Sequence, residues 1–162
     1  MAKTKQKGHK PFTQFGTVAV NRRARHDYEL EETYEAGLAL YGTEVKALRE
    51  GRCSIKQAYA DDKGGELWLL NAHIGEYSAA MFKHDPKRQR KLLMRTREIK
   101  HLLGQINQSG YTLVPLRIYF NKRGLAKLEF ALARGKRKVD KREAEKQRDW
   151  QRRKRQLLRE RG

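Results

Sequence analysis

YTLVPLRIYF (residues 111–120) and LAKLEFALAR (residues 125–134) flank the four residues NKRG, and these two runs decide the fold class. In the second run, Leu128, Phe130 and Leu132 point to one face and Lys127 and Glu129 to the other, as in a half-buried strand. Two such runs joined by a short link that contains a glycine predict an antiparallel hairpin.

Further strands are predicted upstream of this hairpin. We expect them at residues 17–20, 27–34, 54–60 and 66–74, with a turn at residues 61–65 and an apolar run at residues 38–41 that follows a bulge or tight bend at Gly37. Pro115 lacks an N–H to donate, so its strand should lie at an edge or contain a break. A set of six to eight short strands is best closed as an antiparallel barrel or a strongly curved sheet, because both avoid a long exposed edge.

Two helices are predicted among the strands. Thr43 can cap the amino end of a short helix, TEVKALRE, that Gly51 ends. Asp85-Pro86 has the composition of a second helix start, and the apolar spacing behind it predicts a helix to about Gln108.

Positive charge is concentrated at both ends of the chain. The formal net charge is +19, and residues 135–162 hold 13 Lys or Arg against 5 Asp or Glu, while residues 1–14 hold four Lys and no acid. We expect residues 1–14 to be a disordered arm. Residues 135–162 are rich in helix formers, but Val139, Trp150 and Leu157 make too sparse an apolar stripe to hold a helix by packing. This tail should be disordered alone and helical against an anionic surface.

Composition also limits the classes of function. A charge of this size attracts polyanions, which leaves nucleic acid, an anionic membrane face or an acidic protein as partners. The longest apolar runs are too short to span a bilayer, no apolar stretch follows the basic start, and Cys53 is the only cysteine. We therefore expect a cytoplasmic protein with no membrane association.

Catalysis has weak support in the sequence. His26-Asp27 and the glutamates that follow suggest a metal nuclease, but acids along one strand alternate between faces and do not converge on one ion. The remaining histidines lack metal-ligand spacing, and no phosphate-binding loop or nucleophile motif is present. We expect no enzyme, no metal and no cofactor.

Several short segments have the composition of an RNA-binding surface. NRRARHDY (residues 21–28) offers arginines and an imidazole to phosphates and bases, although an ordinary solvated loop would look the same. HDPKRQRK (residues 84–91) places cations at a predicted helix start, where a docked phosphate would suit both the cations and the helix dipole. Glu35 can cap an amide, pair with an arginine or accept from a base edge, and a structural role is favoured. Trp150 has no apolar neighbours in the charged tail to pack against, so we interpret it as an anchor for a binding partner.

Five stretches of the chain, in this order, match one known family: NRRARHDYELEETYEAGLALYGTEVKALREG (21–51), AYA (58–60), HDPKRQRKLL (84–93), GYTLVPLRIYF (110–120) and ARGKRKVDKRE (133–143). On these stretches the chain resembles the SmpB family, which binds transfer-messenger RNA (tmRNA) in bacterial ribosome rescue. The resemblance implies an OB-like antiparallel β-barrel at residues 15–134 with flanking helices, a disordered basic tail at residues 135–162, and no catalytic activity. The barrel would bind the tRNA-like domain of tmRNA, and the tail would form a helix in the empty mRNA channel of a stalled ribosome.

The resemblance also implies which residues act. The RNA-binding surface, or its support, would comprise Asn21, Arg23, Arg25, His26, Glu35 and Lys127. The tail segment needed on the ribosome would comprise Gly135, Lys136, Arg137, Asp140, Lys141, Arg142 and Trp150, with Leu157 and Leu158 at positions that are often apolar. The tail opens with Gly-Lys-Arg where the family commonly has Gly-Lys-Lys, and the charge is kept. The alternative is a ribosomal or assembly protein of similar composition, and we expect a monomer in either case.

Overall fold

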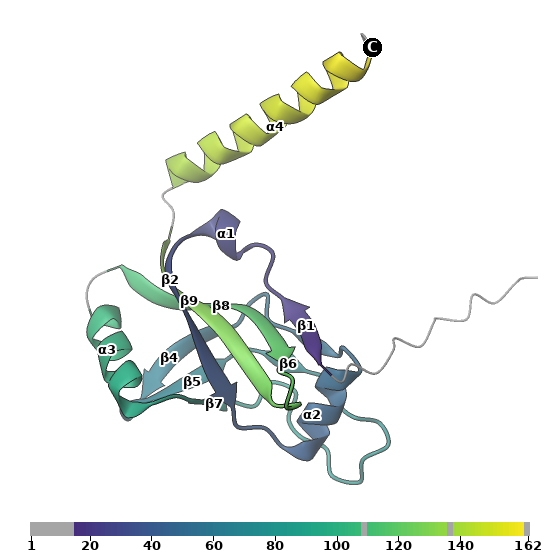
Figure 1. The fold of residues 1–162 in the computed structure, drawn as a ribbon, viewed down its shortest axis with the longest axis vertical. Coiled ribbons are helices and arrows are strands. Elements are labelled where there is room, and N and C mark those ends of the chain that lie inside the picture. The colour runs from purple at the N-terminus through teal and green to yellow at the C-terminus, as the bar shows by residue number, and fades with distance from the viewer. Residues whose placement is uncertain (1–14, 108–109, 136–137, 161–162) are drawn as a thin grey trace, which may run out of the picture.

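The computed structural model describes residues 15–107, 110–135 and 138–160, which form an antiparallel sheet with helices around it (Figure 1). The predicted arm at residues 1–14 lies outside this part of the chain. The strands are β1 Gly16–Val20, β2 Tyr28–Leu38, β3 Cys53–Ser54, β4 Tyr59–Lys63, β5 Glu66–Leu70, β6 His73–Ile74, β7 Arg90–Leu93, β8 Tyr111–Phe120 and β9 Ala126–Gly135. The helices are α1 Ala24–Asp27, α2 Gly42–Arg49, α3 Thr96–Ile106 and α4 Lys138–Glu160.

The large sheet closes on itself like a ring. Its strand order is β1-β8-β4-β5-β7-β2-β9, and β8 also pairs with β9, so all strands but β1 lie in a closed circuit. The predicted hairpin is confirmed as β8 and β9, which pair from Phe120 opposite Ala126 outward. Leu69, Leu113, Leu128 and Phe130 fill the interior and are fully buried. Closure leaves few unpaired backbone groups along the sheet.

Of two local predictions about the strands, one is confirmed and one is wrong. The register of β8 shifts between Pro115 and Arg117, so the predicted edge or break at Pro115 is present as a break, in a strand that pairs on both sides. Gly37 is not at a bulge, because it pairs in β2 with Leu93 on one side and Lys127 on the other. A Cβ at Gly37 would lie 3.2 Å from that of Leu93, so glycine allows this close approach.

The long helix predicted from Asp85 to Gln108 is wrong. Asp85 starts only a turn, in which its Oδ1 accepts from the N–H of Lys87, and β7 follows. In β7 the buried side chains of Arg90 and Leu92 alternate with more exposed neighbours, a period of two that the helical reading missed. The helix proper is α3, which places Leu102 in the core. The one-turn helix α1 was not predicted. The helix near Thr43 is confirmed as α2, but its N-cap is Tyr41, and Thr43 lies inside the first turn.

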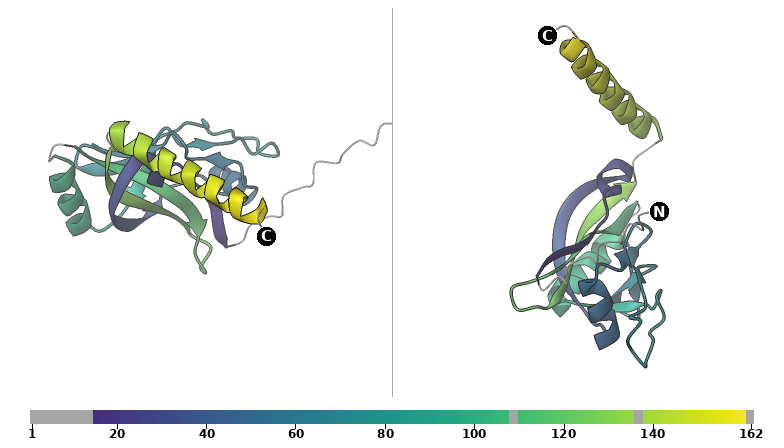
Figure 2. Two further views of the ribbon diagram at one scale, coloured as in Figure 1. Left: turned by 90° about the horizontal axis from the view of Figure 1, so that it is seen from above. Right: turned by 90° about the vertical axis from the view of Figure 1, so that its right-hand side faces the viewer.

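The C-terminal tail is a helix rather than a disordered segment. α4 runs for 23 residues and projects from the body, next to α1 (Figures 1 and 2). Proline and glycine are absent from it, and most of its residues are strong helix formers. Local propensity over this length therefore outweighs the lack of an intramolecular packing partner, on which the prediction of disorder depended.

A buried ion cluster joins α2 to β7. Glu44 and Arg90 are fully buried, and Glu44 accepts from Arg90 Nε at 2.6 Å and from Arg88 Nη2 at 2.5 Å. The backbone N–H of Tyr41 also donates to Glu44, at 3.0 Å, and Arg90 Nη1 donates to the carbonyl of Ala72 at 2.7 Å. Burial raises the pKa of Glu44, but hydrogen bonds from Arg88, Tyr41 and Arg90 outweigh it, so the pKa lies below its usual 4.5.

Removing the charge of Glu44 should destabilise the fold strongly. Glu44→Gln keeps the side-chain shape but leaves Arg90 charged and buried, so the free energy of unfolding should fall by about 3–5 kcal/mol in urea titrations. The matched control is Glu66→Gln, because Glu66 pairs with Lys91 at 2.9 Å near the surface. This substitution should lower the free energy of unfolding by only about 0–1 kcal/mol.

The stabilities of wild type and Glu44→Gln should also depend differently on pH. A depressed carboxyl pKa stabilises the fold above pH 4.5, and this contribution is lost as the pH falls below that value. The gap between wild type and Glu44→Gln should therefore narrow at acid pH. Equal stabilities of wild type and Glu44→Gln at neutral pH would contradict the role given to Glu44.

Candidate nucleic-acid interface

One polar strip crosses the outer face of the sheet. Cross-strand register places Glu35 of β2 opposite Glu129 of β9, and it places Lys127 and Glu129 opposite Tyr119 and Arg117 of β8. Their sequence neighbours Ala36, Leu128 and Ile118 point into the core. We call Glu35, Arg117, Tyr119, Lys127 and Glu129 the outer strip.

Hydrogen bonds hold the outer strip in place. Arg117 Nε donates to Glu129 Oε2 at 2.6 Å, and the Arg117 guanidinium lies 4.3 Å from the centre of the Tyr119 ring. The hydroxyl of Tyr119 donates to Glu35 Oε2. Glu35 thus neither caps an amide nor pairs with an arginine among the described contacts, and it is presented on the surface by a tyrosine. Partial burial, together with the hydrogen bond and charge of Glu35, raises the pKa of Tyr119 to about 12.

An open cavity adjoins the outer strip. Its volume is about 660 Å³, and Glu35, Lys127, Lys91 and Leu93 are among its lining residues. Leu93 is 51% exposed, at the end of β7 beside Gly37. An apolar surface flanked by ammonium groups and a carboxylate can receive a nucleoside and its phosphate. Sequence reasoning missed Leu93, because it placed residues 90–93 in a helix. The alternation of a strand would have placed Leu93 on the outer face of the sheet.

The turn before β2 carries the predicted arginine cluster. Asn21 is buried and ties this turn to β8, since its Nδ2 donates to the carbonyl of Pro115 at 3.1 Å and its N–H to that of Leu116 at 2.8 Å. Arg23 and Arg25 are exposed. Asn21 therefore supports the arginines rather than offering its side chain to solvent.

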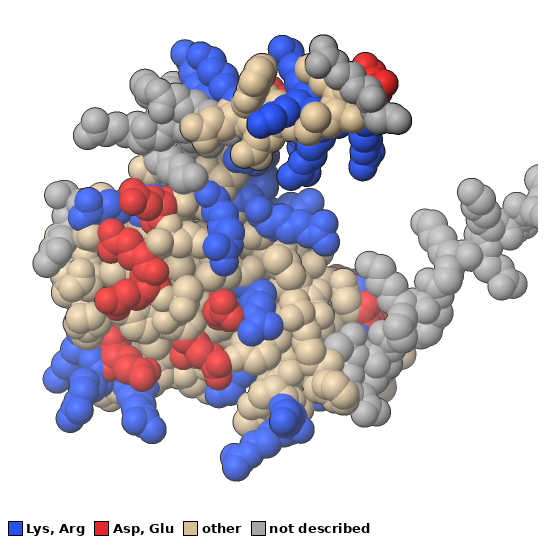
Figure 3. All heavy atoms as spheres, turned by 45° about the horizontal axis from the view of Figure 1, so that its top comes forward, with Lys and Arg blue, Asp and Glu red and all other residues tan. Residues whose placement is uncertain are grey.

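The arginine turn and the outer strip form one continuous face. A shallow cavity of about 220 Å³ is lined by Arg22 and Arg25 from the turn and by Arg117 and Glu129 from the strip. Arg25 thus lies near the strip that contains Glu35 and Lys127. Figure 3 shows Lys and Arg side chains gathered at the α4 end of the molecule, above a face that carries Asp and Glu.

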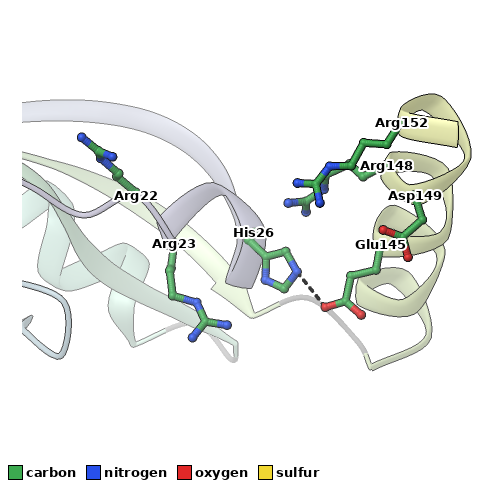
Figure 4. A pocket seen from close by; sticks show the side chains of 7 residues that line it. All are labelled: Arg22, Arg23, His26, Glu145, Arg148, Asp149 and Arg152. Carbon is green, nitrogen blue, oxygen red and sulfur yellow. Dashed lines mark hydrogen bonds and ion pairs between the residues drawn. The ribbon is translucent and has the colours of Figure 1, made fainter. Parts of the chain in front are cut away.

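Arg23 and His26 face α4 instead. They line a cavity of about 370 Å³ with Glu145 and Arg148 of that helix (Figure 4). His26 is held from both sides, with Nδ1 at 2.9 Å from Asp27 Oδ1 and Nε2 at 3.1 Å from Glu145 Oε1. Sequence reasoning gave no sign of Glu145, which is 119 residues away along the chain.

Six of the nine predicted tail residues lie on α4. Gly135 ends β9, Asp140 and Lys141 lie near the start of α4, and Lys136 and Arg137 fall outside the described residues. The remaining four are exposed, namely Arg142, Trp150, Leu157 and Leu158. Trp150 and Leu157 are two helical turns apart and therefore share one side of α4.

The cations of residues 84–91 do not form the predicted phosphate site. His84 is buried and bonds to Thr43 Oγ1 and to the carbonyl of Ile74, both at 2.9 Å. Arg88 and Arg90 bind Glu44. These residues build the core, and no helix starts among them.

Neither a metal cluster nor a membrane helix is found in the part of the chain that the structure describes. There, no three His, Cys, Asp or Glu side chains gather closely enough to hold a metal ion. None of the helices described is long and apolar enough to cross a membrane.

Comparisons with known proteins agree in pointing to one family. The family model described as "SmpB protein" matches residues 18–160. An "SsrA-binding protein" of Sinorhizobium medicae is 57% identical over 146 residues, which is 90% of this chain and 92% of the relative. One from Agrobacterium fabrum is 58% identical over 142 residues, 87% and 89% of the two chains. A solved chain described as "tmRNA-SmpB: a journey to the center of the bacterial ribosome" superposes with a TM-score of 0.64 at 50% identity, covering 82% of this chain and 94% of that one.

The tyrosine that holds Glu35 should ionise late. At pH 11 an ordinary tyrosine, with a pKa near 10, is mostly ionised, whereas Tyr119 should remain protonated. Carbon NMR of the tyrosine ring, with Tyr119→Phe to assign the signal, measures this directly. Glu35→Gln should shift the titration midpoint downward, and an unchanged midpoint would show that Glu35 does not engage the hydroxyl.

Proposed function

Because the chain belongs to the SmpB protein family, we propose that it binds tmRNA, also called SsrA RNA, and brings it to stalled ribosomes in trans-translation. The match extends from within β1 to the end of α4, so both the body and the tail are included. The observation that carries the proposal is the continuous face formed by the arginine turn and the outer strip, which unites Arg25, Glu35 and Lys127.

The outer strip and its cavity would receive the tRNA-like domain. Lys127 supplies a phosphate contact, and Glu35, oriented by Tyr119, accepts from an exocyclic amine at a base edge. Leu93 packs against a sugar or base in the same cavity. Arg23, Arg25 and His26 extend the contact across the turn, and Asn21 fixes that turn to the sheet. In this way the body would take the place of an anticodon stem.

The tail would report that the mRNA channel is empty. The exposed cations of α4 and its apolar Trp150, Leu157 and Leu158 suit a channel walled by RNA and protein. Its opening residues Gly135, Lys136, Arg137, Asp140, Lys141 and Arg142 would lie near the decoding centre. An mRNA already in the channel would exclude the helix, which gives selectivity without base readout.

The remaining features follow from the same proposal. The closed ring of strands is an OB-like barrel at residues 15–134, and residues 135–162 act as a separate tail. The protein works in the cytoplasm as a monomer, catalyses no reaction and needs no cofactor. Its rate of encounter with RNA rests on its net charge of +19.

Substitutions in the outer strip should separate phosphate contact from base readout. Lys127→Ala should weaken tmRNA binding by about tenfold and lower the slope of log affinity against log salt by about one. Glu35→Ala should weaken binding to a similar extent without lowering that slope, because a base contact releases no counterion. Filter binding at several salt concentrations measures both quantities.

The matched control is Lys122→Ala, since Lys122 is an exposed lysine at the tip of the β8–β9 hairpin, outside the outer strip. It should change the affinity by less than twofold. An equal loss for Lys122→Ala and Lys127→Ala would mean that bulk charge, rather than the outer strip, binds the RNA.

A further inference from the structure

The helix α4 docks on the arginine turn through its charged face. Across the cavity between them, His26 Nε2 lies 3.1 Å from Glu145 Oε1, and only 17% of the His26 side chain remains exposed. The other α4 residues that line this cavity are Arg148, Asp149 and Arg152. Spacings of three and four residues place these side chains on one face of the helix, which Figure 4 shows turned toward His26.

The apolar side chains of α4 point in another direction. At about 100° per residue, Trp150 and Leu157 lie about 120–140° around the helix from Glu145. Both side chains are exposed. Docking therefore uses the charged face of α4 and leaves these apolar residues uncovered.

Docking occupies residues that the proposed function gives to RNA. Arg23 and His26 line the cavity, and His26 Nε2 cannot bond to Glu145 and to RNA at the same time. A phosphate beside Arg23 would also lie near the carboxylates of Glu145 and Asp149, and like charges at short range repel each other. Docking of α4 and binding of RNA at the turn therefore exclude each other.

The docked contact is weak enough to be displaced. The Glu145 side chain is 60% exposed, and an exposed pair of this kind favours the bound form by about fivefold at most. Arg148 and Arg152 line the same cavity as Arg22 and Arg23, so repulsion among these guanidinium groups also limits the stability of the docked state. A polyanion that attaches through several phosphates can therefore displace α4.

We propose that α4 is docked on the arginine turn in the free chain and that tmRNA releases it by binding Arg23 and His26. The body thereby couples the loading of RNA to the release of the tail. The docked state rests on the contact between His26 and Glu145, whereas its release by tmRNA rests on the proposed function.

NMR of the full chain without RNA measures docking. Heteronuclear NOE values of the α4 amides should be close to those of the sheet in wild type, because a docked helix tumbles with the body, and lower in Glu145→Gln. The matched control is Glu160→Gln, which removes the same charge at the far end of α4 and should behave as wild type. Equal values in wild type and Glu145→Gln would overturn the proposal.

Addition of the tRNA-like domain of tmRNA to the wild-type chain tests release. The NOE values of the α4 amides should then fall below those of the sheet. Values for α4 that stay at the level of the sheet in the complex would show that RNA does not release the helix, and would overturn the proposal.

Filter binding of the same RNA measures the competition. Because a docked fraction lowers the apparent affinity, Glu145→Gln should bind the RNA about two- to fivefold more tightly than Glu160→Gln. Equal affinities would overturn the proposal, since both variants lose one negative charge. Failure of the wild-type chain to bind this RNA would refute the proposed function and the release with it, while the NOE comparison of the free proteins would still decide docking.

Discussion

The ion pair between Glu44 and Arg90 is the constraint on which the rest of the structure depends. Both side chains are fully buried, so neither can lose its partner without leaving a charge in the core. Glu44 belongs to α2 and Arg90 to β7, and Arg88 ties the loop before β7 to the same carboxylate. One carboxylate therefore ties α2, β7 and the loop before β7 together, alongside the hydrogen bond between His84 Nδ1 and Thr43 Oγ1.

This constraint also positions the functional surfaces. With Arg90 turned inward, alternation along β7 turns Lys91 and Leu93 outward, where they line the cavity beside Glu35 and Lys127. The same cluster fixes Arg88 over the ring of Tyr41. The proposed RNA contact thus has a buried support, and the outer strip adds its own hydrogen bonds through Arg117 and Tyr119.

Local patterns predicted the fold well where strands alternate clearly and badly where buried charges interrupt the pattern. The β8–β9 hairpin follows from period-two alternation and a short link, and it is present. Residues 84–91 look like a cationic helix start, and only the three-dimensional structure shows that Arg90 has a buried carboxylate partner 46 residues away. Likewise, Glu35 was found from the sequence, but its partner Tyr119, 84 residues away, was not. Pairings over such distances depend on sheet register, which sequence pattern alone does not determine.

The identity of the RNA that co-purifies with the protein from cells tests the central claim most directly. If the body binds the tRNA-like domain, tmRNA should be recovered both with the full chain and with a chain ending at Arg134, which retains the outer strip and the arginine turn. Recovery of ribosomal RNA alone, or loss of tmRNA on removal of the tail, would contradict the assignment of tmRNA binding to the body.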